Sequence, residues 1–81
     1  MKAIVQVRLK NGILDPQGKT VNNALHHLGF QNIDNVRVGK LIEFEINESD
    51  KEKAFQLIED ACKKLLSNPV IEDFTYELGE E

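Results

Sequence analysis

Hydrophobic and polar positions alternate over the first ten residues of the chain. The odd positions from residue 3 to residue 9 are apolar (Ala3, Val5, Val7 and Leu9), and most of the even positions are polar (Lys2, Gln6, Arg8 and Lys10). Successive side chains of a strand point to opposite faces, so a period of two predicts a strand with one buried face. The Asn-Gly pair at 11–12 then predicts a turn.

A helical period follows the turn. Apolar residues recur at spacings of three, four and seven: Val21, Ala24, Leu25 and Leu28. Asp15 is a candidate N-cap because proline occupies the first helical position after it. The helix is therefore predicted from near residue 16 to residue 28, with Gly29 after its end. Gly18 is expected to weaken the first turn by up to about 1 kcal/mol relative to alanine.

The alternating pattern returns over residues 36–46, where each even position except Lys40 is apolar. A strand of this length is about twice the usual ~5–6 residues, which is long for so small a domain. Either Gly39-Lys40 bends or splits the strand, or part of it pairs with another chain. We favour a strand that extends beyond its own sheet and pairs across an oligomer interface.

A second helix and a closing strand complete the pattern. Ser49 and Glu52 match a capping box, and an apolar stripe runs from Ala54 to Leu65. The helix should end before the Ser-Asn-Pro segment at 67–69, since proline disfavours helical geometry in the preceding residue. Residues 70–78 alternate again and predict the last strand.

The predicted order is thus β-α-β-α-β, with the long middle strand counting as one or two. Strands that alternate with amphipathic helices favour a ferredoxin-like α+β fold. We expect one antiparallel or mixed sheet with two helices on one face, extended by oligomerisation. The chain has 81 residues and shows no linker or repeat, so residues 1–81 are predicted to form a single domain.

Composition narrows the class of partner. The formal net charge is −4, whereas nonspecific nucleic-acid binding needs a basic surface, so neither nucleic acid nor an anionic membrane is an expected partner. The N-terminal segment carries charge where a signal peptide needs apolar residues. The single cysteine, Cys62, cannot form an internal disulfide. Both features favour a cytoplasmic location.

The sequence offers little catalytic chemistry. His26 and His27 are adjacent on a helix and point about 100° apart, so the pair does not suggest a metal site. Cys62 falls on the apolar stripe of the second helix, which favours core packing over nucleophilic function. No phosphate-binding or Ser-His-Asp motif is present. We therefore expect no catalytic, cofactor or metal site in this chain, and a role in holding partner proteins together.

Four segments carry a resemblance to a known family. They are residues 9–18 (LKNGILDPQG), 28–30 (LGF), 36–40 (VRVGK) and 62–74 (CKKLLSNPVIEDF). Their order and content resemble the PurS family, the small subunit of phosphoribosylformylglycinamidine (FGAM) synthase in de novo purine biosynthesis. The resemblance covers nearly the whole chain.

The resemblance implies membership of a complex of three kinds of subunit. A glutaminase frees ammonia from glutamine, and a synthetase that uses ATP and Mg consumes it to form the amidine. The PurS-like subunit carries neither active site and binds no cofactor itself. It is thought to join the two enzymes, and to assist ammonia transfer, as a homodimer or dimer of dimers.

Two turn regions are our candidates for partner docking, because they combine exposed turn geometry with motif character. The candidate contacts are Gly12, Ile13, Leu14, Asp15, Gln17, Gly18, Arg37, Gly39 and Lys40. A structural role for each glycine is the alternative, as is an N-capped helix entry for the first region. An ACT-like module that binds a small molecule at a dimer interface is the alternative function.

Overall fold

A computed structural model describes residues 1–79 of the chain. The described residues form three strands and two α-helices, in the order β1 (Lys2–Leu9), α1 (Pro16–His27), β2 (Lys40–Glu45), α2 (Lys51–Ala61) and β3 (Glu72–Gly79). A short π-helical segment, η1 (Cys62–Leu66), continues α2. The strands form one antiparallel sheet in the order β2-β1-β3. The predicted fold class and order of elements are confirmed.

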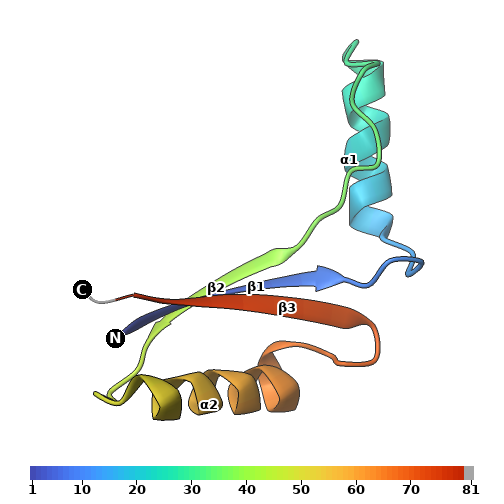
Figure 1. The fold of residues 1–81 in the computed structure, drawn as a ribbon. Helices are drawn as coiled ribbons and strands as arrows, with labels where there is room; N and C mark the ends of the chain where they lie inside the picture. The colour runs from blue at the N-terminus through green and yellow to red at the C-terminus, as the bar shows by residue number, and fades with distance from the viewer. Residues whose placement is uncertain (80–81) are drawn as a thin grey trace.

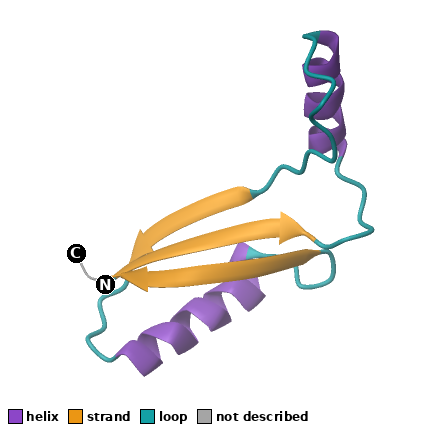
Figure 2. Cartoon of the chain, turned by 45° about the horizontal axis from the view of Figure 1, so that its top comes forward, coloured by secondary structure: helices purple, strands orange, loops and turns teal. Residues whose placement is uncertain are grey.

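The hydrophobic core lies between the sheet and α2. Val5 stands opposite Ile42 on one side and Tyr76 on the other, so the alternation predicted for β1 fills the centre of the covered face. Three residues of β1 and three of α2 and η1 are completely or almost completely buried: Ala3, Val5, Val7, Ala54, Ile58 and Cys62. Figure 2 shows α2 lying along this face.

The middle strand is shorter than its sequence pattern. Pairing with β1 ends where Lys40 meets Val7, and residues 36–39 lie outside the sheet. Gly39 passes so close to β1 that a Cβ there would lie 2.6 Å from the carbonyl oxygen of Val7. Of the alternatives that the sequence left open, the single chain shows the interruption at Gly39-Lys40, because the strand begins at Lys40.

Helix α1 does not cover the sheet, which corrects the expectation of two helices on one face within one chain. Figure 1 shows α1 pointing away from the sheet while α2 runs along it. Within α1 only Gly18 is buried, and Val21 and Leu28 of the apolar stripe are exposed. The periodicity identified the helix and its ends correctly. It could not identify the surface that the stripe packs against, because an apolar stripe does not specify its partner.

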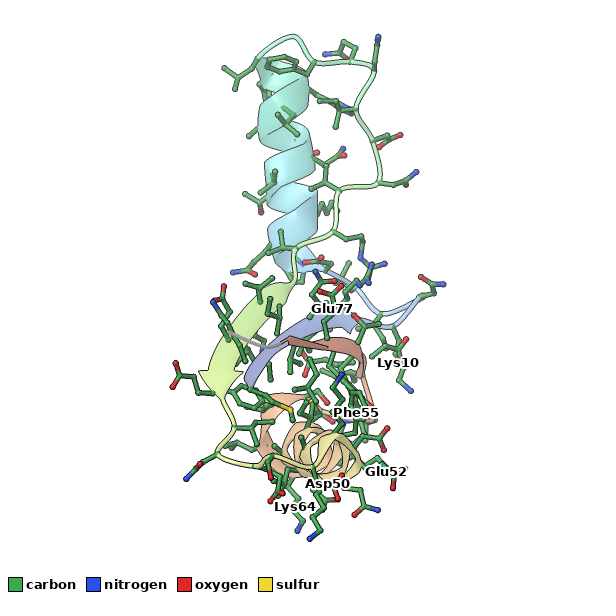
Figure 3. The ribbon with its side chains drawn as sticks, turned by 60° about the vertical axis from the view of Figure 1, so that its left-hand side comes forward. Lys10, Asp50, Glu52, Phe55, Lys64 and Glu77 are labelled. Atoms are coloured by element: carbon green, nitrogen blue, oxygen red, sulfur yellow. The ribbon has the colours of Figure 1, made fainter. Side chains whose placement is uncertain are left out.

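The entry and exit of the second helical segment differ slightly from the sequence prediction. The N-cap is Asp50, whose Oδ1 accepts a hydrogen bond of 3.0 Å from the Glu52 N–H, in place of the expected Ser49. Asp50 and Glu52 lie together at the start of α2 (Figure 3). The segment ends at Leu66, as predicted. Strand β3 begins at Glu72 because Asn68 organises a turn over residues 68–71, which leaves Val70 exposed.

Within the described residues, no helix combines the length and the apolar character needed to cross a membrane.

Candidate functional site

The chain leaves the sheet after β1 and returns to it before β2, and these two crossings meet at Asp15. We call residues 11–39 the arm: it contains α1 and the segment that returns from it. Figure 1 shows the arm extending from one end of the sheet. Most of the predicted contact residues lie at its root.

Asp15 joins the two crossings through both carboxylate oxygens. Oδ1 accepts a 2.9 Å hydrogen bond from the Gly18 N–H and so caps α1. Oδ2 accepts a 2.8 Å hydrogen bond from the Val38 N–H, in the segment that returns to β2. The side chain is buried although it carries a charge. A buried carboxylate is stabilised when hydrogen bonds satisfy its oxygens.

Arg37 connects Asp15 to the sheet. Its Nε lies 3.6 Å from Asp15 Oδ2, and its Nη2 donates to the carbonyl oxygens of Leu9 and Lys10, at 3.1 and 3.3 Å. Arginine suits this place because one planar group carries several donors. Asp15, Gly18, Arg37 and Val38 thus form a continuous set of contacts, which we call the clasp.

The clasp stabilises the charged form of Asp15. The Gly18 N–H, followed by the Val38 N–H, holds the pKa of Asp15 below its ordinary value, and Arg37 lowers this pKa further, against the opposing effect of burial. A carboxyl group with a lowered folded pKa contributes stability above its unfolded pKa. That contribution is lost as the pH falls through the folded pKa.

Because the pKa of Asp15 is lowered in the folded chain, the effect of Asp15→Asn on stability should depend on pH. The wild-type chain should exceed the variant in stability most clearly near neutral pH, and the gap should shrink as the pH falls below about 4. Urea unfolding of both chains at neutral pH and near pH 3 measures the gap. Arg37 is the charged group facing Asp15. A gap that stays constant with pH would contradict the prediction.

Two glycines allow the crossings to approach so closely. A Cβ at Gly18 would overlap the carbonyl oxygen of Val36 and lie 2.8 Å from Asp15 Oδ2. Gly39 is similarly confined by Val7. Real Cβ atoms do not approach backbone oxygens this closely, so both positions require glycine for packing. Gly12 differs, because it has open space around it and a φ of +87°, which glycine adopts without strain.

The nine predicted contact residues therefore divide into two groups. Asp15, Gly18, Arg37 and Gly39 are used in contacts within the chain. The others are exposed or, for Ile13, partly exposed on the surrounding surface: Gly12, Ile13, Leu14, Gln17 and Lys40. Leu14 is 73% exposed, a large fraction for leucine. Lys40 Nζ lies 3.8 Å from Glu72 Oε2, in an ion pair whose lysine side chain is exposed and whose glutamate side chain is largely buried.

The clasp is completed by backbone groups that were not predicted from the sequence, namely the Val38 N–H and the carbonyl oxygens of Leu9 and Lys10. No side-chain pattern could reveal them. An open hollow of about 550 Å³ within the arm, between its outgoing and returning segments, was not predicted either. The hollow is lined in part by Asn11, Lys19, Asn22, Asp34 and Asn35.

Cys62 lies in the core, as its place on the apolar stripe predicted. The residue has no exposed surface, and burial followed by the nearby Glu59 charge raises the pKa of the thiol. Because the thiolate is the reactive form, both burial and the raised pKa suppress reaction.

Thiol labelling tests this placement. Under native conditions at neutral pH, Cys62 should react with a thiol reagent at least roughly a hundredfold more slowly than in denaturant, because reaction requires the core to open. Absorbance with a chromogenic disulfide measures both rates. Rapid labelling of the native chain would show that Cys62 is accessible and would contradict the placement.

The histidine pair lies at the end of α1. His26 Nε2 forms a 2.7 Å hydrogen bond with the carbonyl oxygen of Ile33, and Gln31 donates to the His26 carbonyl. His26 therefore helps to hold the returning segment beside α1. Over residues 1–79, no cluster of three or more His, Cys, Asp or Glu side chains is arranged to hold a metal.

Tyr76 connects β3 to α2. Its hydroxyl donates a 2.9 Å hydrogen bond to Glu59 Oε1, and this bond, followed by burial, raises the pKa of the phenol. The phenol therefore stays protonated at neutral pH. The Tyr76–Glu59 hydrogen bond therefore holds α2 against β3.

Known proteins resemble this chain in sequence and architecture. The PurS family model, described as phosphoribosylformylglycinamidine (FGAM) synthase, matches residues 2–80. The phosphoribosylformylglycinamidine synthase subunit PurS of Bacillus subtilis is 44% identical over 98% of this chain and 93% of its own. The corresponding subunit of Methanocaldococcus jannaschii is 44% identical over 90% of this chain and 88% of its own.

Solved structures agree with the sequence relatives. Bacillus subtilis PurS superposes with a TM-score of 0.86 at 44% identity and covers 98% of both chains. A chain in the structure of PurLQS from Thermotoga maritima gives a TM-score of 0.86 at 32% identity, over 94% of this chain and 93% of that one. Since the family model spans residues 2–80 and the relatives match over nearly their full length, the chain belongs to the PurS family of FGAM synthase subunits.

Proposed function

We propose that this chain is the small, noncatalytic subunit of FGAM synthase and that it joins the glutaminase and the ATP-dependent synthetase of that complex. The observation that carries the proposal is the close match, in sequence and fold, to a chain of the Thermotoga maritima PurLQS structure. The exposed apolar residues of the arm and of α2 suit a protein whose work is to contact others.

Reconstitution tests the proposal. Purified chain mixed with the glutaminase and synthetase subunits should support amidine formation from glutamine, and omission of the chain should abolish or sharply reduce it. Ammonium chloride in place of glutamine is the matched control. If the chain assists ammonia transfer between the enzymes, its omission reduces the glutamine-dependent rate more than the ammonium-dependent rate. Full glutamine-dependent activity without the chain would refute the proposal.

We extend the proposal to self-association, with a homodimer or dimer of dimers. In the single chain, the apolar stripe of α1 lies uncovered and α2 covers the sheet without a second helix. A second copy would cover the apolar stripe of α1, and its own α1 would supply the second helix beside the sheet. The Val38 N–H already donates to Asp15 and is not free for pairing between chains. Main-chain pairing between copies would therefore run along β2.

Sedimentation at micromolar concentration tests self-association. Leu28→Lys should weaken it, because the change places a charge on an exposed apolar residue beside α1. Asn23→Lys adds the same charge to an exposed polar position of α1 and is the control. A wild-type chain that sediments as a monomer, or equal behaviour of the two variants, would contradict the interface.

The exposed members of the predicted contact set remain our proposed docking surface for the enzyme subunits. Leu14 carries the most exposed apolar side chain among them. Leu14→Asp should reduce reconstituted activity and leave the unfolding midpoint of the isolated chain unchanged. Unaltered activity would remove Leu14 from the surface.

Two further features belong to the same proposal. Residues 1–81 act as one domain, which a single unfolding transition in fluorescence and circular dichroism would support. The complex works in the cytoplasm, in keeping with the single buried thiol of Cys62. Cell fractionation tests the location.

A further inference from the structure

The direction of the arm depends on few contacts. Helix α1 has at most marginal contact with the other helices and strands, so side-chain packing does not hold it in place. Figures 1 and 2 both show it standing clear of the sheet. An element joined to the rest by two chain crossings without packing would ordinarily move as a hinged body.

The clasp restrains movement of the arm at this hinge. It runs from the first turn of α1 through the Asp15 carboxylate to Val38 and Arg37, and from Arg37 to the carbonyl oxygens at the end of β1. The bonds to the Asp15 carboxylate join the two crossings of the arm, and the bonds from Arg37 join the arm to the end of β1, so movement of the arm against the sheet breaks the hydrogen bonds that the charged Arg37 donates. Such bonds are stronger than those between neutral groups.

We propose that the Asp15–Arg37 clasp holds the arm at a fixed angle to the sheet, so that the free chain already presents α1 in the orientation that assembly requires. The proposal rests on the proposed function, in which α1 contacts a second copy. Preorganisation favours association because less conformational freedom is lost on binding. Asp15 and Arg37 are positioning residues in this role.

Asp15→Asn should break the clasp and keep the N-cap of α1. Asparagine is as good an N-cap as aspartate, so its Oδ1 can still accept from Gly18. Its amide NH₂ would face the Val38 N–H and the Arg37 guanidinium, which are donors, and the link across the hinge is lost. Asp34→Asn makes the same change elsewhere on the hollow, where Asp34 Oδ1 accepts a hydrogen bond from the adjacent Asn35 N–H. It is the matched control.

Single-molecule energy transfer reports the arm directly. Dyes attached through Asn23→Cys on α1 and Thr75→Cys on β3 occupy exposed positions, and the buried Cys62 should not label. At picomolar concentration the chain is alone. The wild-type chain and Asp34→Asn should give one narrow distribution of transfer efficiency, and Asp15→Asn a broad or shifted one. Arg37→Gln, which leaves the cap untouched, should act like Asp15→Asn.

Self-association is the second readout. The concentration for half-association should rise roughly tenfold in Asp15→Asn, as expected if about one third of the molecules hold the competent orientation, because both copies in a dimer must hold it. Narrow, unshifted distributions in both clasp variants would overturn the proposal, as would unchanged association. If the wild-type chain fails to associate at all, the proposed interface is wrong, and the energy-transfer result still decides whether the clasp fixes the arm.

Discussion

Ile58→Ala is expected to lower the free energy of unfolding by roughly 2–5 kcal/mol, the range for removal of a large aliphatic side chain from a packed core. Ile58 has no exposed surface and lies on the face of α2 that meets the sheet. A domain of this size has a marginal stability of only about 5–15 kcal/mol at most. The substitution should therefore reduce the unfolding midpoint by about 10 °C or more.

Thermal and urea unfolding at one fixed protein concentration measure this effect, since self-association would make stability depend on concentration. Gln56→Ala is the control on the same helix, because Gln56 is exposed and its loss should change stability by no more than about 0.5 kcal/mol. Similar small effects from both substitutions would mean that α2 does not pack on the sheet through Ile58.

Gly18→Ala has the second largest expected effect, and its sign distinguishes two physical accounts. Helix propensity alone predicts stabilisation by up to about 1 kcal/mol, because alanine replaces glycine near the start of α1. The structure predicts the opposite. The added methyl would overlap the Val36 carbonyl oxygen, and overpacking of this kind costs about 1–3 kcal/mol. Net destabilisation of about 1–2 kcal/mol is expected after propensity is offset.

Gly79→Ala is the control for Gly18→Ala, since a Cβ at Gly79 would meet no atom within 4 Å. Its effect on the unfolding midpoint should be close to zero. Stabilisation by Gly18→Ala would show that the two crossings at the arm root are not in close contact in solution.

The clasp changes the role expected of the two turn regions that the sequence suggested for partner docking. Asp15, Gly18 and Arg37 were predicted as docking contacts, yet each makes contacts within its own chain. Substitution of these residues should therefore alter the arm before it alters any partner surface. Leu14 and Lys40 are better probes of docking, because their side chains are largely exposed.

Local patterns were sufficient for the element types and their order. The period of two in β1 and the period of 3.6 in both helices arise from backbone geometry, so each pattern can be read within a short window. The Asp15-Pro16 pair located the start of α1, and the Ser-Asn-Pro segment at 67–69 located the end of the second helical segment. Family membership also followed from short motifs in the right order.

Tertiary structure alone decided where the strand 36–46 stops and where α1 lies. An apolar stripe indicates that a helix has a face to bury, but any apolar surface could receive it, including one on another molecule. The split before Lys40 depends on the Val38 N–H meeting Asp15 Oδ2 across 23 positions of sequence. Backbone N–H and C=O groups are the same in every residue except proline, so only the folded arrangement determines which of them a side chain will bind.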